Sequence, residues 1–235
     1  MITIIVIIGL TGIAAAEDEL KLTTQMDFFS KYIWRGQNAT DGPVAQPSFT
    51  FSHKNFTLSA WGNLELDNAN NNRWNITETD ITFDYTNYLP GQSMVEYSFG
   101  FIRYDFPHTN FDNTTELYAG LSLKTIFNPY VKLYRDVDEV NGTYVSTGLS
   151  KSLCYGFDMA TSIGWGDKNY NHAYWGKSND RINDFVLSLS RPIETKWFNI
   201  VPSLTYVSLL DKDLGKIGKS GRDDFVLGIS LIKEF

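Results

Sequence analysis

Hydrophobic and polar residues alternate along most of this chain, beginning at about Leu20. The first segment places mostly apolar side chains at every second position and polar or charged side chains between them. One face carries Leu22, Thr24, Met26, Phe28, Tyr32 and Trp34, and the other carries Lys21, Gln25, Asp27 and Lys31. A two-residue period is typical of a β-strand with one apolar and one polar face. No segment shows a competing helical period.

The same alternation recurs along the chain and predicts twelve strands. Each of the first four strands is followed by a polar connection, and these connections lie at 35–45, 53–55, 67–74 and 87–91. The other eight are expected near 92–105, 114–125, 129–136, 143–152, 156–166, 181–190, 196–210 and 223–235.

The connections between these strands alternate in length. Long polar segments lie at 35–45, 67–74, 106–113, 137–142, 167–180 and 211–222, and short ones at 53–55, 87–91, 126–128, 153–155 and 191–195. Bacterial outer-membrane barrels have an even number of strands, short periplasmic turns and longer extracellular loops. The sequence therefore predicts an all-β fold, a transmembrane up-and-down antiparallel β-barrel of about 12 strands that forms one domain over residues 17–235.

Charged residues distinguish the two faces of the predicted strands. The apolar faces carry charges only near strand ends, where long side chains can reach lipid headgroups. The polar faces carry charges at mid-strand, which an apolar core would not accept unpaired. We therefore expect a water-filled lumen with these pore-lining residues: Glu65, Glu78, Asp80, Asp84, Glu96, Glu116, Lys124, Lys132, Asp158 and Asp184.

Aromatic residues near the strand ends predict an interfacial girdle at each rim. Tyr32 and Trp34 belong to the expected outer girdle, and Phe198 and Phe235 to the inner one. Pro202 argues against a regular sheet because it lies inside a predicted strand, where it removes a ladder hydrogen bond. We therefore expect a bulge or break in the eleventh strand.

Residues 1–16 have the pattern of a signal peptide. An apolar run from Met1 ends on small residues, and cleavage is expected after Ala16. A membrane anchor is the alternative, but it needs about 20 apolar residues. Export by this signal predicts localisation in the bacterial outer membrane, with outer-membrane lipid as a partner.

Composition excludes several other classes of protein. With 27 acidic and 20 basic residues the net charge is −7, so the chain lacks the positive field of a nucleic-acid-binding protein. Apart from residues 1–16, no apolar run is long enough for a transmembrane helix. The single Cys154 cannot form an internal disulfide or a multi-cysteine metal site. No cofactor or metal is expected.

Two segments carry a family resemblance. The chain ends DDFVLGISLIKEF, and this resembles the last strand of bacterial outer-membrane barrels, in which a terminal aromatic residue, here Phe235, is recognised by the barrel-assembly machinery. Ser30 to Gln46 reads SKYIWRGQNATDGPVAQ and resembles the TorF-like porins, a proteobacterial family mostly classed as of unknown function. The resemblance implies a porin fold, and the family has no established catalytic or binding residues to carry over to this chain.

Arg35 closes the first predicted strand and is the candidate residue at the pore mouth. A guanidinium there would guide anions, or would form an ion pair that fixes the first loop, for instance with Asp41. The acidic wall has the same two interpretations, since its carboxylates either attract cations to an open pore or pair and plug a narrow bore. Twelve strands lie between the eight that leave no channel and the sixteen that leave a wide one.

The sequence offers little for catalysis. His53, His108 and His172 fall in predicted turns or loops, and no Gly-x-Ser-x-Gly motif occurs. The prediction is a porin, not an enzyme, that lets small hydrophilic solutes or ions diffuse passively, with a preference for cations. The alternatives are a closed structural or adhesive barrel that acts through its outer loops and a lipid-modifying enzyme at the rim.

Overall fold

Twelve antiparallel strands close into a barrel in the computed structural model, which describes residues 19–215 and 221–235. The predicted signal peptide, residues 1–16, lies outside the described residues. The barrel strands are β1 (Lys21–Phe29), β4 (Val44–His53), β5 (Phe56–Glu65), β6 (Ile76–Leu89), β7 (Gln92–Asp105), β8 (Thr114–Leu123), β9 (Tyr130–Asp136), β10 (Thr143–Ser152), β11 (Asp158–Gly166), β12 (Arg181–Ser190), β14 (Asn199–Leu209) and β15 (Asp223–Glu234).

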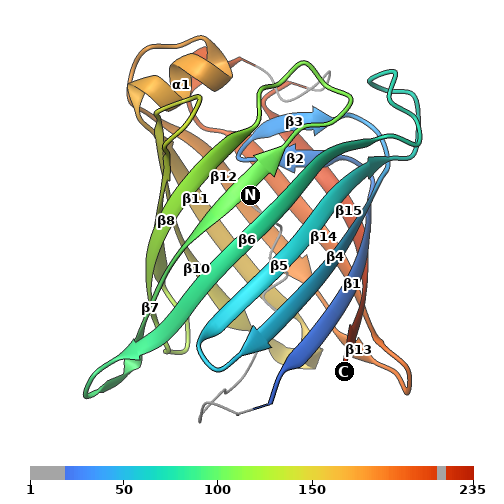
Figure 1. Cartoon of the computed structure of the whole chain (residues 1–235), viewed down its shortest axis with the longest axis vertical. Coiled ribbons are helices and arrows are strands. Elements are labelled where there is room, and N and C mark those ends of the chain that lie inside the picture. The colour runs from blue at the N-terminus through green and yellow to red at the C-terminus, as the bar shows by residue number, and fades with distance from the viewer. Residues whose placement is uncertain (1–18, 216–220) are drawn as a thin grey trace.

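Neighbours along the chain are neighbours in the sheet, and the first and last strands close the ring. β1 pairs with both β4 and β15, and the backbone N–H of Phe235 donates to the carbonyl of Leu22 at 2.9 Å. The strands are steeply tilted (Figure 1), as closure of a barrel requires. The predicted all-β fold of twelve strands is confirmed.

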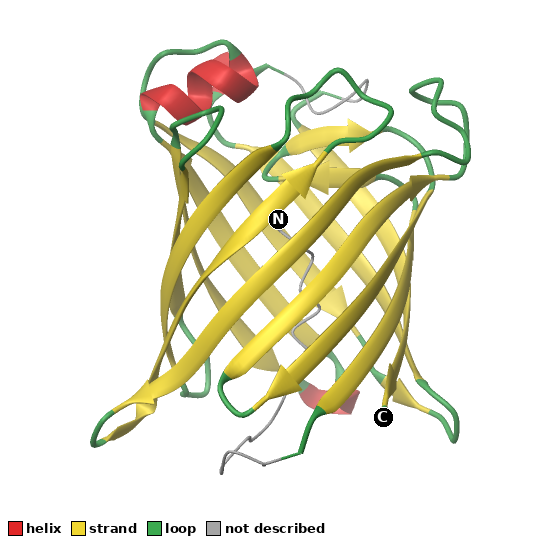
Figure 2. Ribbon diagram, in the orientation of Figure 1, coloured by secondary structure: helices red, strands yellow, loops and turns green. Residues whose placement is uncertain are grey.

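The connections separate into two kinds, one at each end of the barrel. Figure 2 shows the long loops together at one end, with the helix α1 (Lys168–Trp175) among them, and the shorter turns at the other. We call these the loop end and the turn end. The C-terminus lies at the turn end (Figure 1). The short strand β13 (Ile193–Glu194) extends the sheet beside β14 at one of the turns.

Large apolar side chains remain exposed on the outward face of the barrel. Phe49 is 53% exposed, Leu121 50% and Leu227 63%. Polar residues at the intervening positions, such as Asn63 and Ser146, are buried on the inward face. An apolar exterior around a polar interior is the arrangement of a barrel that faces lipid outside.

Tyrosine rings inside the barrel pack against glycines on neighbouring strands. Gly164 of β11 leaves the space that the hydroxyl of Tyr144 on β10 occupies, and a Cβ at Gly100 would overlap the carbonyl of Phe83 and the hydroxyl of Tyr118. Absence of a Cβ at these positions therefore lets bulky rings lie against the wall, which is why glycines interrupt otherwise regular strands.

The first strand is shorter than predicted. β1 ends at Phe29, and the chain then forms a separate hairpin of β2 (Tyr32–Trp34) and β3 (Gln37–Thr40), which lies inside the barrel near the loop end (Figure 1). The expected positions of Tyr32 and Trp34 in an outer lipid-facing girdle are therefore wrong. Three consecutive apolar residues at 32–34 break the two-residue period, and Tyr32 and Ile33 are buried in the interior.

Pro202 causes no bulge or break, contrary to expectation. β14 pairs with β15 in continuous register from Asn199 to Ser208, and Pro202 lies opposite Ile229. On its other side the ladder with β12 ends at the pair Ser190 and Ser203. One residue beyond that ladder the Arg191 N–H donates to the Pro202 carbonyl at 3.1 Å, so the missing N–H of Pro202 costs only the return bond at the end of the ladder.

The long connection at 167–180 contains a helix that the sequence interpretation did not include. The Asp167 side chain accepts a hydrogen bond from the Tyr170 N–H at 2.8 Å, and Gly176 ends α1 in the left-handed conformation with φ 65°. These are ordinary helix-capping residues. No helix in residues 19–215 and 221–235 has the length and apolar character needed to cross a membrane.

Candidate functional site

The inward hairpin, residues 30–43 with β2 and β3, is held at its base by ion pairs and hydrogen bonds to the barrel wall. The Lys31 ammonium lies 2.8 Å from a carboxylate oxygen of Asp224 on β15 and 3.3 Å from Asp41. The Thr40 hydroxyl donates to Glu65 on β5 at 3.2 Å. Both sides of the hairpin are therefore fastened to the wall.

Arg35 and Gly36 form the tip of the hairpin. Trp34 pairs with Gln37 across them, and their φ angles are 47° and 79°. Positive φ at both central residues is the signature of a type I′ two-residue hairpin turn, whose twist suits the paired strands. The Arg-Gly dipeptide therefore makes a tight turn and does not end a long strand.

The turn carries the Arg35 side chain into the barrel, where it forms a bidentate ion pair with Glu116 on β8. Both hydrogen bonds are 2.7 Å long, and the Tyr104 hydroxyl adds a third to Glu116 at 2.9 Å. The Arg35 side chain has no exposed area. Burial alone would lower the pKa of Arg35, but the charge of Glu116 raises it well above its usual range, so the guanidinium stays charged.

Aromatic rings enclose the Arg35 guanidinium. Its central carbon lies 4.6 Å from the ring centre of Trp34 and 4.4 Å from each of the rings of Tyr134 and Tyr144. Tyr170 of α1 lies over the same group at 5.8 Å. Cation–π contacts of this kind strengthen when water is excluded, so the rings and Glu116 together hold the tip in place.

The hairpin also contacts the wall on the other side of the interior. A Cβ added to Gly36 would lie 2.8 Å from Leu209 on β14 and 2.9 Å from Asp184 on β12. Arg35 contacts β8, and Gly36 contacts β12 and β14. In the ring of strands β8 lies well apart from β12 and β14. The tip therefore extends across the interior and narrows it near the loop end.

Apolar side chains fill the space beside the hairpin. Tyr32 and Ile33 pack with Trp61, Val207 and Val226 from the wall. The rings of Tyr32 and Trp61 lie 5.7 Å apart. Burial of these groups favours the inward position of the hairpin through the hydrophobic effect.

The predicted pore-lining residues divide between the two ends. Near the loop end, Glu65, Glu116 and Asp184 are buried and hydrogen-bonded, and Asp184 accepts from the Tyr144 hydroxyl at 2.9 Å. Glu78 and Asp80 are also buried, at 8% and 1% exposed.

Nearer the turn end the charged side chains are more exposed. Lys124 forms an ion pair with Glu96 at 3.1 Å, and Asp158 accepts from Ser152 at 2.6 Å. These three charged side chains are therefore paired or hydrogen-bonded to side chains of the same end.

Lys132 and Asp84 lie between these two levels. The Lys132 ammonium lies 3.9 Å from the ring centre of Tyr118, whose hydroxyl donates to Asp84. One basic and one acidic side chain therefore flank the same ring in the middle of the wall.

Arg35 was predicted at the pore mouth, where it would guide anions or form an ion pair that fixes the first loop, for instance with Asp41. The structure places its side chain in the interior, where it forms an ion pair with Glu116. The aromatic residues around it were not predicted as a group. Tyr104, Tyr134 and Tyr144 lie on the polar face of their strands, and this position is the signal that could have identified them.

The remaining candidates form no convincing second site. His172 Nδ1 lies 3.1 Å from the Ser178 hydroxyl, but this pair is exposed, and none of the described carboxylates bonds the other ring nitrogen. No group of three or more acidic, histidine or cysteine residues suited to a metal occurs in residues 19–215 and 221–235. Cys154 is an exposed free thiol in a turn.

The fold and the charged interior define the class, a closed twelve-stranded antiparallel barrel with an inward hairpin. The chain belongs to the family described as a bacterial protein of unknown function (Gcw_chp), whose model matches residues 13–208. The resemblance to the TorF-like porins in particular stays a prediction. None of the curated proteins matches the sequence.

Solved structures resemble the chain in fold. A NanC porin aligns with a TM-score of 0.56 and 14% identity, covering 89% of this chain and 98% of the porin. A chain from a study of the in-meso crystallisation of membrane proteins aligns with a TM-score of 0.51 and 8% identity, covering 92% of this chain and 84% of the other. At these identities the likeness concerns the fold alone.

Proposed function

We propose that this protein is a porin of the bacterial outer membrane, through which small hydrophilic solutes or ions diffuse passively. The observation that carries the proposal is the closed barrel with exposed apolar side chains outside and hydrogen-bonded charges inside. Such an exterior is stable in lipid, and a charged interior suits a hydrated path. The loop end would face the medium and the turn end the periplasm.

The closing seam supports a role for the last strand in assembly. Phe235 is 70% exposed, and its backbone pairs with Leu22 at the start of β1. In this proposal the barrel-assembly machinery recognises the C-terminal strand before β1 closes the ring.

Selectivity would come from the interior charges. The pore-lining set contains eight carboxylates, Glu65, Glu78, Asp80, Asp84, Glu96, Glu116, Asp158 and Asp184, and two ammonium groups, Lys124 and Lys132. An acidic excess raises the local concentration of cations. The hairpin would set the size limit, because it narrows the interior near the loop end.

Conductance across a planar bilayer under a salt gradient tests the proposal. A porin should produce stepwise currents whose reversal potential indicates preference for cations. Silence at every voltage would contradict the porin and leave the closed barrel.

Neutralising Glu78, Asp80 and Asp84 together, as Glu78→Gln, Asp80→Asn and Asp84→Asn, should move the reversal potential toward zero. The reason is that these carboxylates supply much of the negative charge on one stretch of the wall. A matched control replaces the exposed loop residues Asp112, Asp138 and Asp180 with Asn. If both triple variants keep the wild-type reversal potential, the three wall carboxylates do not face the permeation path.

A closed structural or adhesive barrel is the second candidate. It is favoured by the two packed clusters around the hairpin, which occupy much of the interior near the loop end. The conductance experiment separates the two, because only a porin passes current. The exposed His172 and Ser178 pair gives a lipid-modifying enzyme little support.

A further inference from the structure

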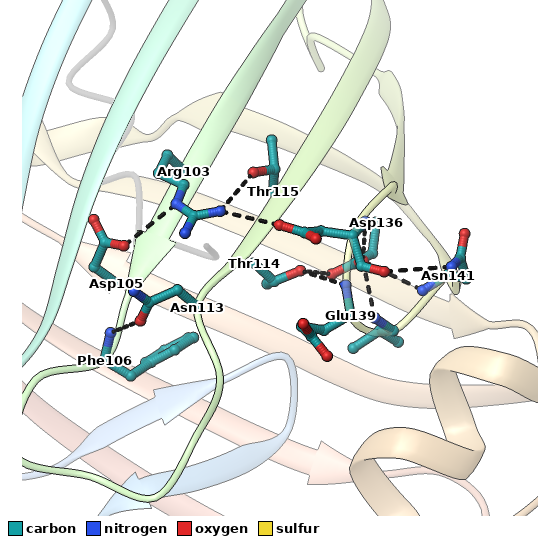
Figure 3. A network of polar contacts seen from close by, with 11 residues as sticks. Arg103, Asp105, Phe106, Asn113, Thr114, Thr115, Asp136, Glu139 and Asn141 are labelled. Atoms are coloured by element: carbon teal, nitrogen blue, oxygen red, sulfur yellow. Dashed lines mark hydrogen bonds and ion pairs between the residues drawn. The ribbon is translucent and has the colours of Figure 1, made fainter.

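On the barrel strands near the loop end, the outward-facing residues Arg103 and Arg135 form ion pairs with carboxylates of the protein itself. Figure 3 shows Arg103 bonded to Asp105 and Thr115. The guanidinium lies 3.3 Å from Asp105 and also 3.0 Å from Asp138. Arg135 lies 3.6 Å from Asp167 and donates to Thr143 at 3.0 Å. Because these ion pairs already compensate the two guanidinium charges, we do not expect them to bind an external anion strongly.

Basic residues on two strands at the turn end have a different environment. The Lys151 ammonium of β10 lies 4.9 Å from the ring centre of Phe127, and the Lys233 ammonium of β15 lies 5.7 Å from that of Phe235. Phe127 is 50% exposed and Phe235 70%. Neither ammonium is in ion-pair contact with a carboxylate among the described residues.

Two turns between these strands repeat the arrangement. Arg191 lies over Phe157 at 5.5 Å, and Lys196 lies over Trp197 at 5.1 Å. Trp197 is 68% exposed. Within residues 19–215 and 221–235, no carboxylate forms an ion pair with either cation.

The four pairs belong to strands that are neighbours in the sheet, in the order β9, β10, β11, β12, β14 and β15. We call them the cationic arc. Farther round the same rim, aromatic rings pack on one another instead, as Phe56 does on Tyr85 at 5.0 Å. Lys21 and Lys54 also lie at the turn end, so the arc is distinguished by cations that lie over aromatic rings without an ion pair among the described residues.

We propose that the cationic arc binds the phosphate headgroups of anionic phospholipid, with phosphatidylglycerol as the simplest example. Aromatic rings at a membrane interface lie at headgroup depth, and a cation over such a ring is held at that depth with its N–H donors free. Clustered Lys and Arg next to the bilayer attract anionic lipid. This inference rests on the proposed location in the outer membrane, but not on conduction.

Spin-labelled lipids test it directly. The folded protein is reconstituted in phosphatidylcholine vesicles with a trace of spin-labelled phosphatidylglycerol or phosphatidylcholine, and the immobilised fraction of each is measured. The anionic lipid should associate at least about fivefold more strongly, the effect of a single cation near an anionic surface. High salt should reduce this preference because it screens exposed charges.

Two variants with the same change in charge locate the site. Replacing Lys151, Arg191, Lys196 and Lys233 with Gln should bring the preference to about one. Replacing Lys168, Lys177, Lys212 and Arg73, which are exposed at the other end, should leave it unchanged, although Arg73 also lies over an aromatic ring, that of Trp74, at 5.5 Å. Equal association of both lipids with the wild type, or an equal loss in both variants, would overturn the proposal.

Two further readouts separate this proposal from the porin. Gel mobility without boiling verifies that each variant is folded. If the variant of the cationic arc fails to fold, the effect of salt on the lipid preference of the wild type still tests whether exposed charges bind the anionic lipid. The arc lies outside the lumen, so its variant should conduct like the wild type. A silent wild-type barrel that still prefers phosphatidylglycerol would contradict the porin and support the arc.

Discussion

Arg35 is the residue on which the arrangement of the interior depends most. A charged side chain this deeply buried is costly unless its charge and its N–H donors are satisfied. Glu116 supplies the opposite charge and accepts two hydrogen bonds from the guanidinium, a bidentate geometry that a lysine in place of Arg35 could not reproduce. The surrounding rings exclude water from the pair.

Replacing Arg35 with Gln, or Glu116 with Gln, should increase single-channel conductance. Either change removes the ion pair that holds the hairpin tip, so the tip should leave the interior more often. The measurement is conductance in planar bilayers, with Lys168→Gln on the exposed surface of α1 as the control. Unchanged conductance in both Arg35→Gln and Glu116→Gln would show that the pair does not restrict the path.

Replacing one residue of the Arg35 and Glu116 pair should destabilise the fold more than replacing both. Removing one partner leaves the other buried and uncompensated, at a cost of about 3–5 kcal/mol. The double variant Arg35→Met with Glu116→Leu should lose less, because no lone charge remains. Denaturant unfolding in detergent, followed by gel mobility, measures both; a double variant less stable than either single one would contradict this.

Gly164 should be intolerant of a larger side chain. A methyl group there would overlap the Tyr144 hydroxyl, which is held by Asp184, and overpacking of this kind costs about 1–3 kcal/mol. Gly62→Ala is the control, since its Cβ would have an ordinary contact of 3.5 Å with the Glu78 carbonyl. We expect Gly164→Ala to lower the unfolding midpoint and Gly62→Ala to change it little.

At the scale of the element, the inward hairpin is short and relies on tertiary contacts. An isolated two-stranded hairpin is marginally stable in water. Here the apolar residues of β2 pack on the wall, Lys31 and Thr40 fasten the base, and α1 places Tyr170 over the tip. The hairpin is therefore positioned by the barrel and not by its own turn alone.

Replacing residues 32–40 with a short Gly-Ser linker should leave the barrel folded and raise its conductance. The twelve strands form their ladders without β2 and β3, whose only strand pairing among the described residues is with each other. Conductance and gel mobility without boiling are measured together. A shortened barrel that folds but conducts like the wild type would mean that the narrowest point lies elsewhere.

At the scale of the whole molecule, closure of the sheet is the main structural constraint. The pairing of β1 with β15 satisfies the backbone groups that an open sheet would leave exposed to lipid. Along this seam the ladder runs from the pair Thr23 and Glu234 to the pair Phe29 and Gly228, and the Ser30 N–H donates to the Leu227 carbonyl just beyond it.

Such a barrel should migrate as a compact species on a gel until it is boiled. The expectation follows from the continuous ring of backbone hydrogen bonds, which detergent at room temperature does not break. Deleting the last strand, residues 223–235, should abolish the compact form, because β1 and β14 would lose their shared partner. A compact band from that deletion would contradict the role of the seam.

Much of the fold follows from the sequence by itself. The strands at 92–105 and 143–152 were predicted at the bounds that β7 and β10 have, because alternation of apolar and polar residues is a local property of each strand. The alternation of long and short connections likewise predicted that the long loops lie at one end of the barrel and the short turns at the other. The acidic residues on the predicted inward faces and the aromatic Phe235 at the end of the last strand can also be identified from the sequence.

The tertiary structure alone decided where the hairpin lies and what Arg35 does. The turn that starts it depends on Lys31 meeting Asp224, 193 residues later, and the tip depends on Glu116, 81 residues away. Contacts at such separations leave no periodic trace in the sequence. The physical reason is that alternation determines only which side of the wall a residue faces, whereas occupancy of the interior depends on how all twelve strands place their inward side chains around a common space.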